Sequence, residues 1–588
     1  MGKISNKQIY FIFFFLSIIV YSPILYNINN LGINDFDYNF FQINVALESI
    51  FKFKEFPLWN PYDQGGVPLL GTSFSRVLNP FMILYFIFPA IIALKFEIIL
   101  MVFLGQIGTY KFLSHKELSR AGAFVGSTLF AFSSYYSLNI TQGHHEFIPA
   151  LLVPFVFYFN EKKGLEKIIG MSLTLTWMFF GGAVYIIVIT MTSILFMTIL
   201  DSIKKRSWRT FIDLIKVIVL FVGLSAIKLF PSVVYMSKYP RVIHDFSGWS
   251  ISSMIHSFVN PGQWITPTTN MEVFYERIAD LVGLSNSTSV LTGIDHGWDE
   301  NGLYLGVGFF IMLFIGFVKK VLDNPRSIYH FVFCMNFLIC FGDRLSFGPW
   351  KLMKLFPLFE SMRHSQRFRV IVLFLSCYYI GSLTSYLFLK MKSSKLVTNT
   401  LVFFLSFSLL SVFYVSHSIV KDAFPFKGFS NIERKKQLSF VGKWQKNDEY
   451  YTFSEVGFYP AFLENHGIAY DKENQTVPLG VRTIFQENYV GEISPDSSAI
   501  VKETNNTKII RNIAESTSLN RNYMFGWTSD HCQLNEKVNN LNLYNCPEGK
   551  EVSLRYWPKS FTVGLIMSVL SLLFMFLIFL RKRSQLIK

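Results

Sequence analysis

Long apolar segments alternate with polar ones along most of the chain. A helix needs about 20 mostly apolar residues to cross the hydrocarbon core of a bilayer, and the pattern predicts about twelve such spans. The predicted spans are residues 8–28, 90–112, 120–138, 147–160, 165–180, 183–200, 212–234, 302–319, 327–342, 368–389, 396–417 and 560–580. We interpret the first as an uncleaved span, because no small-residue cleavage site follows its apolar run. The expected fold class is an α-helical polytopic membrane protein.

Basic residues in the short connecting segments orient these spans. Cytoplasmic loops carry an excess of Lys and Arg. If the N-terminus lies inside, every basic cluster falls inside and the long polar segments 29–89, 236–300, 343–367 and 420–558 fall outside. The clusters are Lys162–Lys163, Lys204–Arg206, Lys319–Lys320, Lys390–Lys395 and Arg581–Arg583. The net charge of +15 therefore reflects membrane topology, and no nucleic-acid partner is expected.

Three parts of the chain differ in composition. Only 16% of all residues are charged and 51% are hydrophobic, which suits the lipid bilayer as the partner of a transmembrane core over residues 1–419. Within that core, residues 80–89 are apolar but bounded by prolines, so a short interfacial helix is expected there. Residues 420–558 contain alternating stretches and turn formers, which predict a small β-rich outer domain. Residues 559–588 then form a final span and a basic cytoplasmic tail.

The five cysteines fall into two groups. Cys334, Cys340 and Cys377 lie in apolar segments, where packing is the ordinary role of a cysteine. Cys532 and Cys546 lie in the outer segment, where an oxidising compartment favours a disulfide. Two buried free thiols are the alternative.

Two carboxylates, Asp35 and Asp37, follow the first span directly. A low-dielectric boundary raises the pKa of a carboxylate and strengthens its pull on an acceptor hydroxyl, so both are candidate catalytic groups. A helix cap and a solvated acid are the alternative. The short segment His144–His145–Glu146 also joins two spans. Its side chains suit an acid/base pair, substrate contacts or a metal site shared by Glu146 and Asp35.

Positive charges on the outer side are candidates for phosphate binding. Lys228 lies near the outer end of a predicted span, where it either meets a lipid phosphate or extends to the headgroups. Arg363 and Arg367 oppose the positive-inside trend, and arginine forks suit phosphate; headgroup anchoring is the alternative. The loop 236–300 adds aromatic and acidic residues that suit a sugar or an interfacial belt. They are Trp249, Trp264, Trp298, Asp295, His296, Asp299 and Glu300.

Several motifs are absent from the sequence. It contains no P-loop, no glycine-rich dinucleotide fingerprint and no Cys-x-x-Cys pair. Nucleotide-driven chemistry and dinucleotide cofactors are therefore unsupported.

Short stretches in order along the chain carry a family resemblance. They are residues 34–35, 55–61 (EFPLWNP), 66–70, 143–144, 300–306, 362–363, 366–368, 522–527, 547–552 and 556–561. Together they resemble the bacterial YfhO-like membrane proteins of the GT-C glycosyltransferase superfamily. The resemblance implies a GT-C-like fold, a polyprenyl-phosphate-linked sugar donor and an essential acid in the first outer loop. Asp35 matches that acid, Asp37 is not matched, and Asn34 stands where the family usually has glycine.

The resemblance leads to one functional hypothesis. We expect an inverting glycosyltransferase in a bacterial cytoplasmic membrane, with both termini cytoplasmic and an envelope glycan or lipid as acceptor. Asp35 would activate the acceptor, while Arg363 and Arg367, with Lys228 and a divalent cation such as Mg²⁺ or Mn²⁺, would hold the phosphate. Further substrate contacts are expected from His144, His145, Trp59, Asn60 and Glu300. The alternatives are a flippase of lipid-linked saccharides and a non-catalytic envelope assembly factor.

Overall fold

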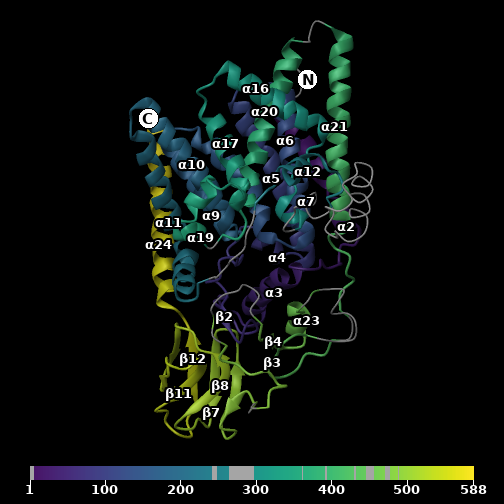
Figure 1. Ribbon diagram of the computed structural model, residues 1–588. Coiled ribbons are helices and arrows are strands. Elements are labelled where there is room, and N and C mark those ends of the chain that lie inside the picture. Colours follow the sequence, from purple (N-terminus) through teal and green to yellow (C-terminus); the bar gives the residue numbers. More distant parts are fainter. Residues whose placement is uncertain are drawn as a thin grey trace.

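The computed structural model describes residues 5–587, except 241–247, 264–296, 361, 391–393, 430–431, 445–453, 455, 471–476, 478, 488 and 490. A bundle of helices forms one end of the molecule and a β-rich region forms the other (Figure 1). The first outer loop and its helix α3 (Phe36–Leu47) lie between the two. Trp264, Asp295 and His296, which were singled out as possible sugar contacts, lie outside the described residues.

Each predicted span coincides with helical segments. The helices are α1 (Asn6–Val20), α5 (Ala90–His115), α6 (Arg120–Phe132), α7 (Ser134–Gln142), α8 (Val153–Asn160), α9 (Gly164–Phe180), α10 (Val184–Lys205), α11 (Arg209–Lys238), α16 (Val307–Asp323), α17 (Ile328–Cys340), α20 (Arg369–Lys390), α21 (Lys395–Lys421) and α24 (Lys559–Ile587). Within the described chain, six helices are long and apolar enough to cross a membrane: α5, α10, α11, α20, α21 and α24. The protein is thus a polytopic membrane protein, and twelve crossings stay a prediction.

Two of the predicted spans are broken rather than continuous. Ser133 adopts an extended conformation between α6 and α7 and so ends one helix before the next begins. Residues 147–160 start as a 3-10 helix (His145–Leu152) that contains Pro149, and only then continue as α8. Proline has no backbone N–H and disfavours a regular α-helix before it. These breaks place polar residues at the end of the bundle that faces the β-rich region.

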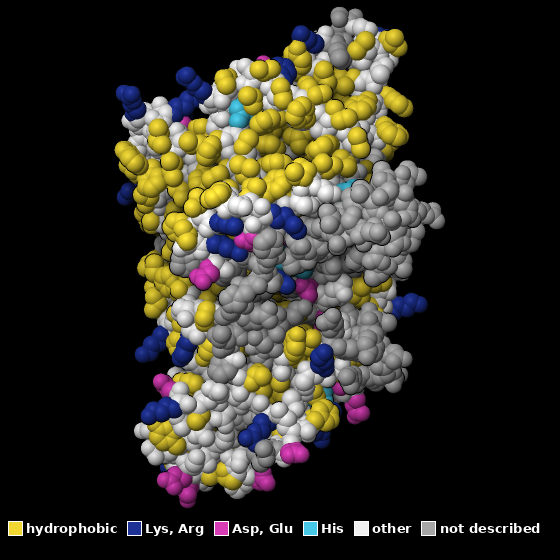
Figure 2. Space-filling model, in the orientation of Figure 1, with side chains coloured by type: hydrophobic (Ala, Val, Ile, Leu, Met, Phe, Trp, Pro, Cys, Tyr) yellow, Lys and Arg dark blue, Asp and Glu magenta, His cyan; other side chains and the backbone are white. Residues whose placement is uncertain are grey.

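Burial separates a central helix from peripheral ones. In the apolar window of each, 83% of α20 is buried within the protein, but only 17% of α21 and 11% of α24. Exposed apolar side chains cover much of the helical part in Figure 2, and several Lys and Arg side chains project at its end farthest from the β-rich region. Lipid is the solvent that suits such an apolar surface.

The polar segment before α24 folds into two four-stranded sheets. One has the strand order β10-β11-β8-β5 and the other β6-β7-β12-β9, and all of their pairings are antiparallel. Alternate residues such as Leu519 and Leu541 from one sheet and Ile510 and Leu554 from the other share one core. The strands are β5 (Ile493–Ser494), β6 (Ala499–Glu503), β7 (Thr507–Arg511), β8 (Thr517–Asn522), β9 (Trp527–Ser529), β10 (Gln533–Leu534), β11 (Asn540–Tyr544) and β12 (Val552–Tyr556). The prediction of a β-rich region is confirmed.

The cysteines pair as the sequence suggested. Cys532 and Cys546 form a disulfide in the β-rich region. Cys340 and Cys377 are free and buried in the helical core, whereas Cys334 is free and exposed.

The first outer loop fastens the β-rich region to the bundle. Its short strands β1 (Trp59–Asn60) and β2 (Val67–Pro68) pair with each other. The Trp59 ring is fully buried against Tyr556, with 4.6 Å between ring centroids, and against Trp527 at 5.2 Å. A second contact joins α3 to α23 (Phe458–Leu463), beside the parallel pair β3 (Ser439–Val441) and β4 (His466–Ile468). The expected helix within residues 80–89 is α4 (Met82–Tyr85), and its interfacial position stays a prediction.

Candidate functional site

One cavity gathers most of the polar residues that the sequence singled out. It has a volume of about 260 Å³ and lies where the start of α3 meets the junction between α7 and the 3-10 helix. Its walls come from several distant parts of the chain. The lining residues are Asp35, Tyr38, Asn39, Phe74, His144, Glu146, Tyr185, Gly297, Asp299, Glu300, Arg363, His364 and Arg367. Six of the predicted site residues, Asp35, His144, Glu146, Glu300, Arg363 and Arg367, are therefore brought together.

Hydrogen bonds fix the start of α3 against the end of α7. The Asp35 amide donates to the Gln142 carbonyl at 3.1 Å, and the Asn39 side chain donates to the Gly143 carbonyl at 2.8 Å. Asn34 also donates through its side chain to Gln142 Oε1 at 2.9 Å. Asn34 has a φ of 60°, in the left-handed region that glycine adopts freely and asparagine tolerates. Asparagine thus fits the position where the resembling family usually has glycine.

Gly143 allows this close approach. Its φ is +81°, and a Cβ atom there would lie 2.1 Å from the backbone nitrogen of Phe36. No side chain can yield to remove that clash, so any larger residue must push the start of α3 away from His144.

We expect Gly143→Ala to lower the free energy of unfolding by about 2–4 kcal/mol, because overpacking adds to backbone strain. Gly428→Ala is the matched control: Gly428 has a φ of +94° and open space around its Cβ position, so only the strain of about 1–2 kcal/mol applies. Denaturant titration in mixed micelles measures both. Equal losses in the two variants would contradict the proposed close contact.

His144 lies between two carboxylates. Its Nε2 atom is 3.0 Å from Asp35 Oδ2, and its Nδ1 atom is 3.8 Å from Asp299 Oδ2. Burial lowers the pKa of His144, but the hydrogen bond to Asp35 and the charges of Asp35, Glu146 and Asp299 outweigh burial and raise it to about 10. Burial raises the pKa of Asp299 in turn. At neutral pH the imidazole is therefore a cation, and its Nε2 atom lies beside the Asp35 carboxyl group.

Glu146 and His145 face different surroundings although they are adjacent. The Glu146 Oε2 atom is buried and makes no hydrogen bond with any described residue, and burial raises the pKa of this carboxyl. His145 does not line the cavity; its ring packs edge-to-face on Phe36, with 5.4 Å between centroids. Burial and the charges of Arg76 and His144 hold the pKa of His145 well below its ordinary value. The structure thus places His145, which the sequence predicts to contact substrate, as a neutral packing residue outside the cavity.

Glu300 binds the cations on the other wall. Arg367 Nε donates to both Glu300 oxygens at 3.1 Å, and its Nη2 atom also contacts Glu300. His364 Nε2 and Arg369 Nη1 lie 3.7 and 3.9 Å from Glu300. Burial alone would raise the pKa of Glu300, but Arg367, His364 and Arg369 hold it well below its ordinary value. Glu300 is therefore an anionic anchor for Arg367, whose guanidinium also lies 4.9 Å from the centroid of the Tyr185 ring.

Asp37, predicted to be catalytic, has structural contacts. Its carboxylate accepts hydrogen bonds from the Ser454 hydroxyl at 2.5 Å and from the amides of Phe458 and Tyr459 at 2.7 Å each. These contacts dock the start of α23 onto α3, which is a helix-capping role. They fit the capping alternative better than proton transfer.

Three other predicted substrate contacts lie away from the cavity. Lys228 is fully buried in α11, and its ammonium donates to the carbonyls of Ser73, Ser75 and Phe179 at 3.1, 2.6 and 2.8 Å. Trp59 and Asn60 are buried beneath the β-rich region. A buried cation that is satisfied by three carbonyls has no donor left for a phosphate, so Lys228 instead joins α9, α11 and the first outer loop.

Some residues of the cavity are not predicted from the sequence. Tyr38, Tyr185 and His364 line it, and Asp299 had been noted only as one of several acids in its loop. Their signal is weak in sequence, because tyrosines are common at the ends of spans. Arg369 supports the wall from behind: it is 1% exposed and donates to the carbonyls of Gly302, at 3.2 Å, and Asp299.

A divalent cation finds no ready ligand set in the described part of the chain. No group of three or more His, Cys, Asp or Glu side chains there is arranged to hold a metal ion. Asp35 Oδ2 lies 3.0 Å from His144 Nε2. The metal site predicted on Asp35 and Glu146 stays a prediction, and no step of the reaction is assigned to a metal.

Comparisons with known proteins identify no family for this chain. No protein-family model matches the chain, and no curated protein matches it. Fold and site together define a polytopic membrane protein with a charged cavity where the first loop meets the helical bundle.

Proposed function

We propose that the protein is a membrane glycosyltransferase that moves a sugar from a polyprenyl-phosphate carrier to an acceptor on the side of the β-rich region. The observation that carries the proposal is the 260 Å³ cavity, whose lining includes a carboxylate paired with an imidazolium (Asp35 and His144) and the cation Arg363. A proton acceptor and cations that can hold a phosphate, together in one cavity, are what transfer from a phosphate leaving group requires. The YfhO-like resemblance supports the same reaction.

A second cavity provides space for the acceptor. It has a volume of about 230 Å³. Its lining residues are Asn34, Asp35, Asp37, Tyr38, Ser454, Val456, Phe458 and Tyr470. Asp35 and Tyr38 line both cavities. A donor sugar in the first cavity and an acceptor hydroxyl in the second would therefore meet at Asp35, and binding both in one place removes much of the entropic cost of a bimolecular reaction.

The chemical step follows from these positions. The acceptor oxygen attacks the anomeric carbon, the bond from that carbon to the phosphate oxygen breaks, and the hydroxyl proton passes to the Asp35 carboxylate. Arg363 stabilises the charge that develops on the departing phosphate, while the His144 imidazolium stays beside Asp35. Attack from the face opposite the phosphate inverts the anomeric centre. Arg367, fixed by Glu300, forms the wall against which the phosphate is positioned.

The transfer rate should depend on the charge of His144. Its pKa of about 10 lies above the ordinary value of about 6.5, so the charged form and its contribution to stability are complete below about pH 6.5 and disappear as the pH rises through 10. We expect wild-type activity to fall through that upper range. His144→Gln should be about tenfold slower or worse at pH 7.5 and should lack this alkaline limb. Initial rates between pH 6 and 10.5 test this, and an unchanged alkaline limb in the variant would contradict it.

A transporter of lipid-linked saccharide is the second candidate, because another charged cavity lies at the opposite end of α10. The two functions differ in where the carrier accumulates. In a strain lacking the protein, a transferase predicts that the polyprenyl-phosphate sugar builds up in the outer leaflet, where membrane-impermeant periodate oxidises it. A transporter predicts accumulation in the inner leaflet, protected from periodate. Mass spectrometry of the lipid extract distinguishes them, and protected carrier would overturn the transferase proposal.

A further inference from the structure

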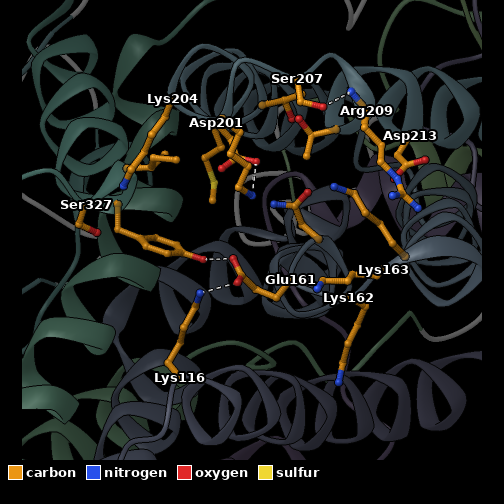
Figure 3. A pocket seen from close by; sticks show the side chains of 18 of the residues that line it. Lys116, Glu161, Lys162, Lys163, Asp201, Lys204, Ser207, Arg209, Asp213 and Ser327 are labelled. Atoms are coloured by element: carbon orange, nitrogen blue, oxygen red, sulfur yellow. Dashed lines mark hydrogen bonds and ion pairs between the residues drawn. The ribbon is translucent and has the colours of Figure 1, made fainter.

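A larger cavity lies at the end of the bundle away from the β-rich region. Its volume is about 500 Å³, and Figure 3 shows basic side chains from several helix ends around it. The charged residues of its lining are Lys116, Glu161, Lys162, Lys163, Lys167, Asp201, Lys204, Lys205, Arg209 and Asp213. The helix α10 connects the two ends, because Tyr185 lines the first cavity and Lys204 lines this one. Nineteen residues of α-helix separate the two cavities by about 28 Å.

Positive charge is in excess here. Seven of the lining side chains are basic and three are acidic. Each of the three acids already has a lysine: Glu161 lies 2.6 Å from Lys116, Asp201 lies 2.7 Å from Lys205, and Asp213 lies 3.8 Å from Lys216. Within the described chain, Lys163, Lys167, Lys204 and Arg209 form no ion pair.

Lys167 is the most informative of these cations. It begins the second turn of α9, is only 6% exposed and lines the cavity. No described residue hydrogen-bonds or ion-pairs with its ammonium, although Asp213, Asp201 and Glu161 attract it from a longer distance. A buried charge without a partner is costly, and an anion in the cavity would remove that cost.

Apolar side chains beside the cavity indicate that the anion carries a lipid tail. Ile203 is 69% exposed and Trp208 is 71% exposed, and both are neighbours in sequence of lining residues. Ile212, on the next turn of α11, is also exposed. Tryptophan at this depth is typical of a membrane interface, and basic pockets between spanning helices bind anionic headgroups.

We propose that this cavity binds the phosphate headgroup of an anionic phospholipid, with Lys167 at its base and Lys204 and Arg209 at its rim, while the acyl chains lie along α10 and α11. This site is independent of the reaction proposed above. An ordinary positively charged surface would need neither a buried lysine nor a cavity.

Native mass spectrometry of the protein from nanodiscs tests the proposal. The nanodiscs contain phosphatidylglycerol and phosphatidylcholine in equal amounts. We expect wild type to retain phosphatidylglycerol selectively, and the Lys204→Gln, Arg209→Gln double variant to bind it at least about tenfold more weakly. Lys167→Gln should have a similar effect. The double variant changes two exposed side chains, so it keeps the test decisive if Lys167→Gln fails to fold.

Lys395→Gln is the matched control, because Lys395 is exposed at the start of α21 and lies outside the cavity lining. It should bind phosphatidylglycerol as wild type does, and an equal loss in this control would reduce the site to general surface charge. Displacement of the lipid by millimolar inorganic phosphate would identify the ligand as a soluble phosphate and overturn the lipid assignment. Equal retention of both lipids would overturn the site altogether.

Discussion

Asp35→Asn is expected to lower the rate of sugar transfer by about 100- to 10,000-fold, the usual contribution of a general base. Asparagine keeps the size of the side chain but cannot accept a proton, and it also removes the anion that holds His144 at 3.0 Å. The hydrogen bond from the backbone N–H of residue 35 to the Gln142 carbonyl is unaffected. Membrane insertion should therefore be retained, while the folded protein loses part of the stabilisation that the charged His144 contributes. Initial rates of transfer in membranes that contain matched amounts of the two proteins measure the effect.

Asp422→Asn serves as the control for that substitution. Asp422 is exposed and follows directly after α21, so its variant should transfer sugar at the wild-type rate. If Asp35→Asn is also fully active, Asp35 is not the base. The mechanism would then have to be rebuilt around Glu146, whose carboxyl lines the same cavity.

Glu300→Gln should destabilise the folded protein by about 3 kcal/mol or more, because removing one partner of a buried ion pair leaves the others uncompensated. Here the groups left are Arg367 and Arg369, both buried, together with His364. The pKa of Glu300 is depressed, so its contribution is complete above the ordinary value of about 4.3 and is lost as the pH falls through the lower folded-state value.

Denaturant titration in mixed micelles at pH 7 and at pH 4 measures this loss. The difference in free energy of unfolding between wild type and Glu300→Gln should be large at pH 7 and should begin to decrease at pH 4. Glu360→Gln, which changes an exposed carboxylate on α19 (Pro357–Glu360), should stay within about 0.5 kcal/mol of wild type. A difference of that small size for Glu300→Gln would contradict the role of Glu300 as anchor of the cavity wall.

Hydropathy predicted most of the helical layout because apolar length is a local property of the sequence. It did not predict the breaks at Ser133 and in the 3-10 helix after His144, which depend on how neighbouring helices pack. The β-rich region was also predictable as a class from alternation and turn residues. Its sheet order was not, because pairings such as β8 with β11 join strands that only the three-dimensional fold brings together.

The site was partly predictable because burying a polar group near a membrane span costs free energy, so such a group usually has a function. That reasoning selected Asp35, His144 and Glu146, which do lie around one cavity. It could not assign Asp37 or Lys228, since their partners are remote: Asp37 binds residues more than 400 positions away, and Lys228 binds carbonyls of the first outer loop. A charged residue that is costly to bury near the membrane needs a partner. The sequence alone does not say whether that partner is a substrate or the protein backbone.

The most direct test of the central claim is glycan analysis of the cell envelope from a strain that lacks the protein, complemented with wild type or with Asp35→Asn at equal membrane levels. A glycosyltransferase centred on Asp35 predicts that one sugar substituent disappears on deletion and returns only with wild type. Full restoration by Asp35→Asn would contradict that account and favour an envelope assembly factor or a transporter.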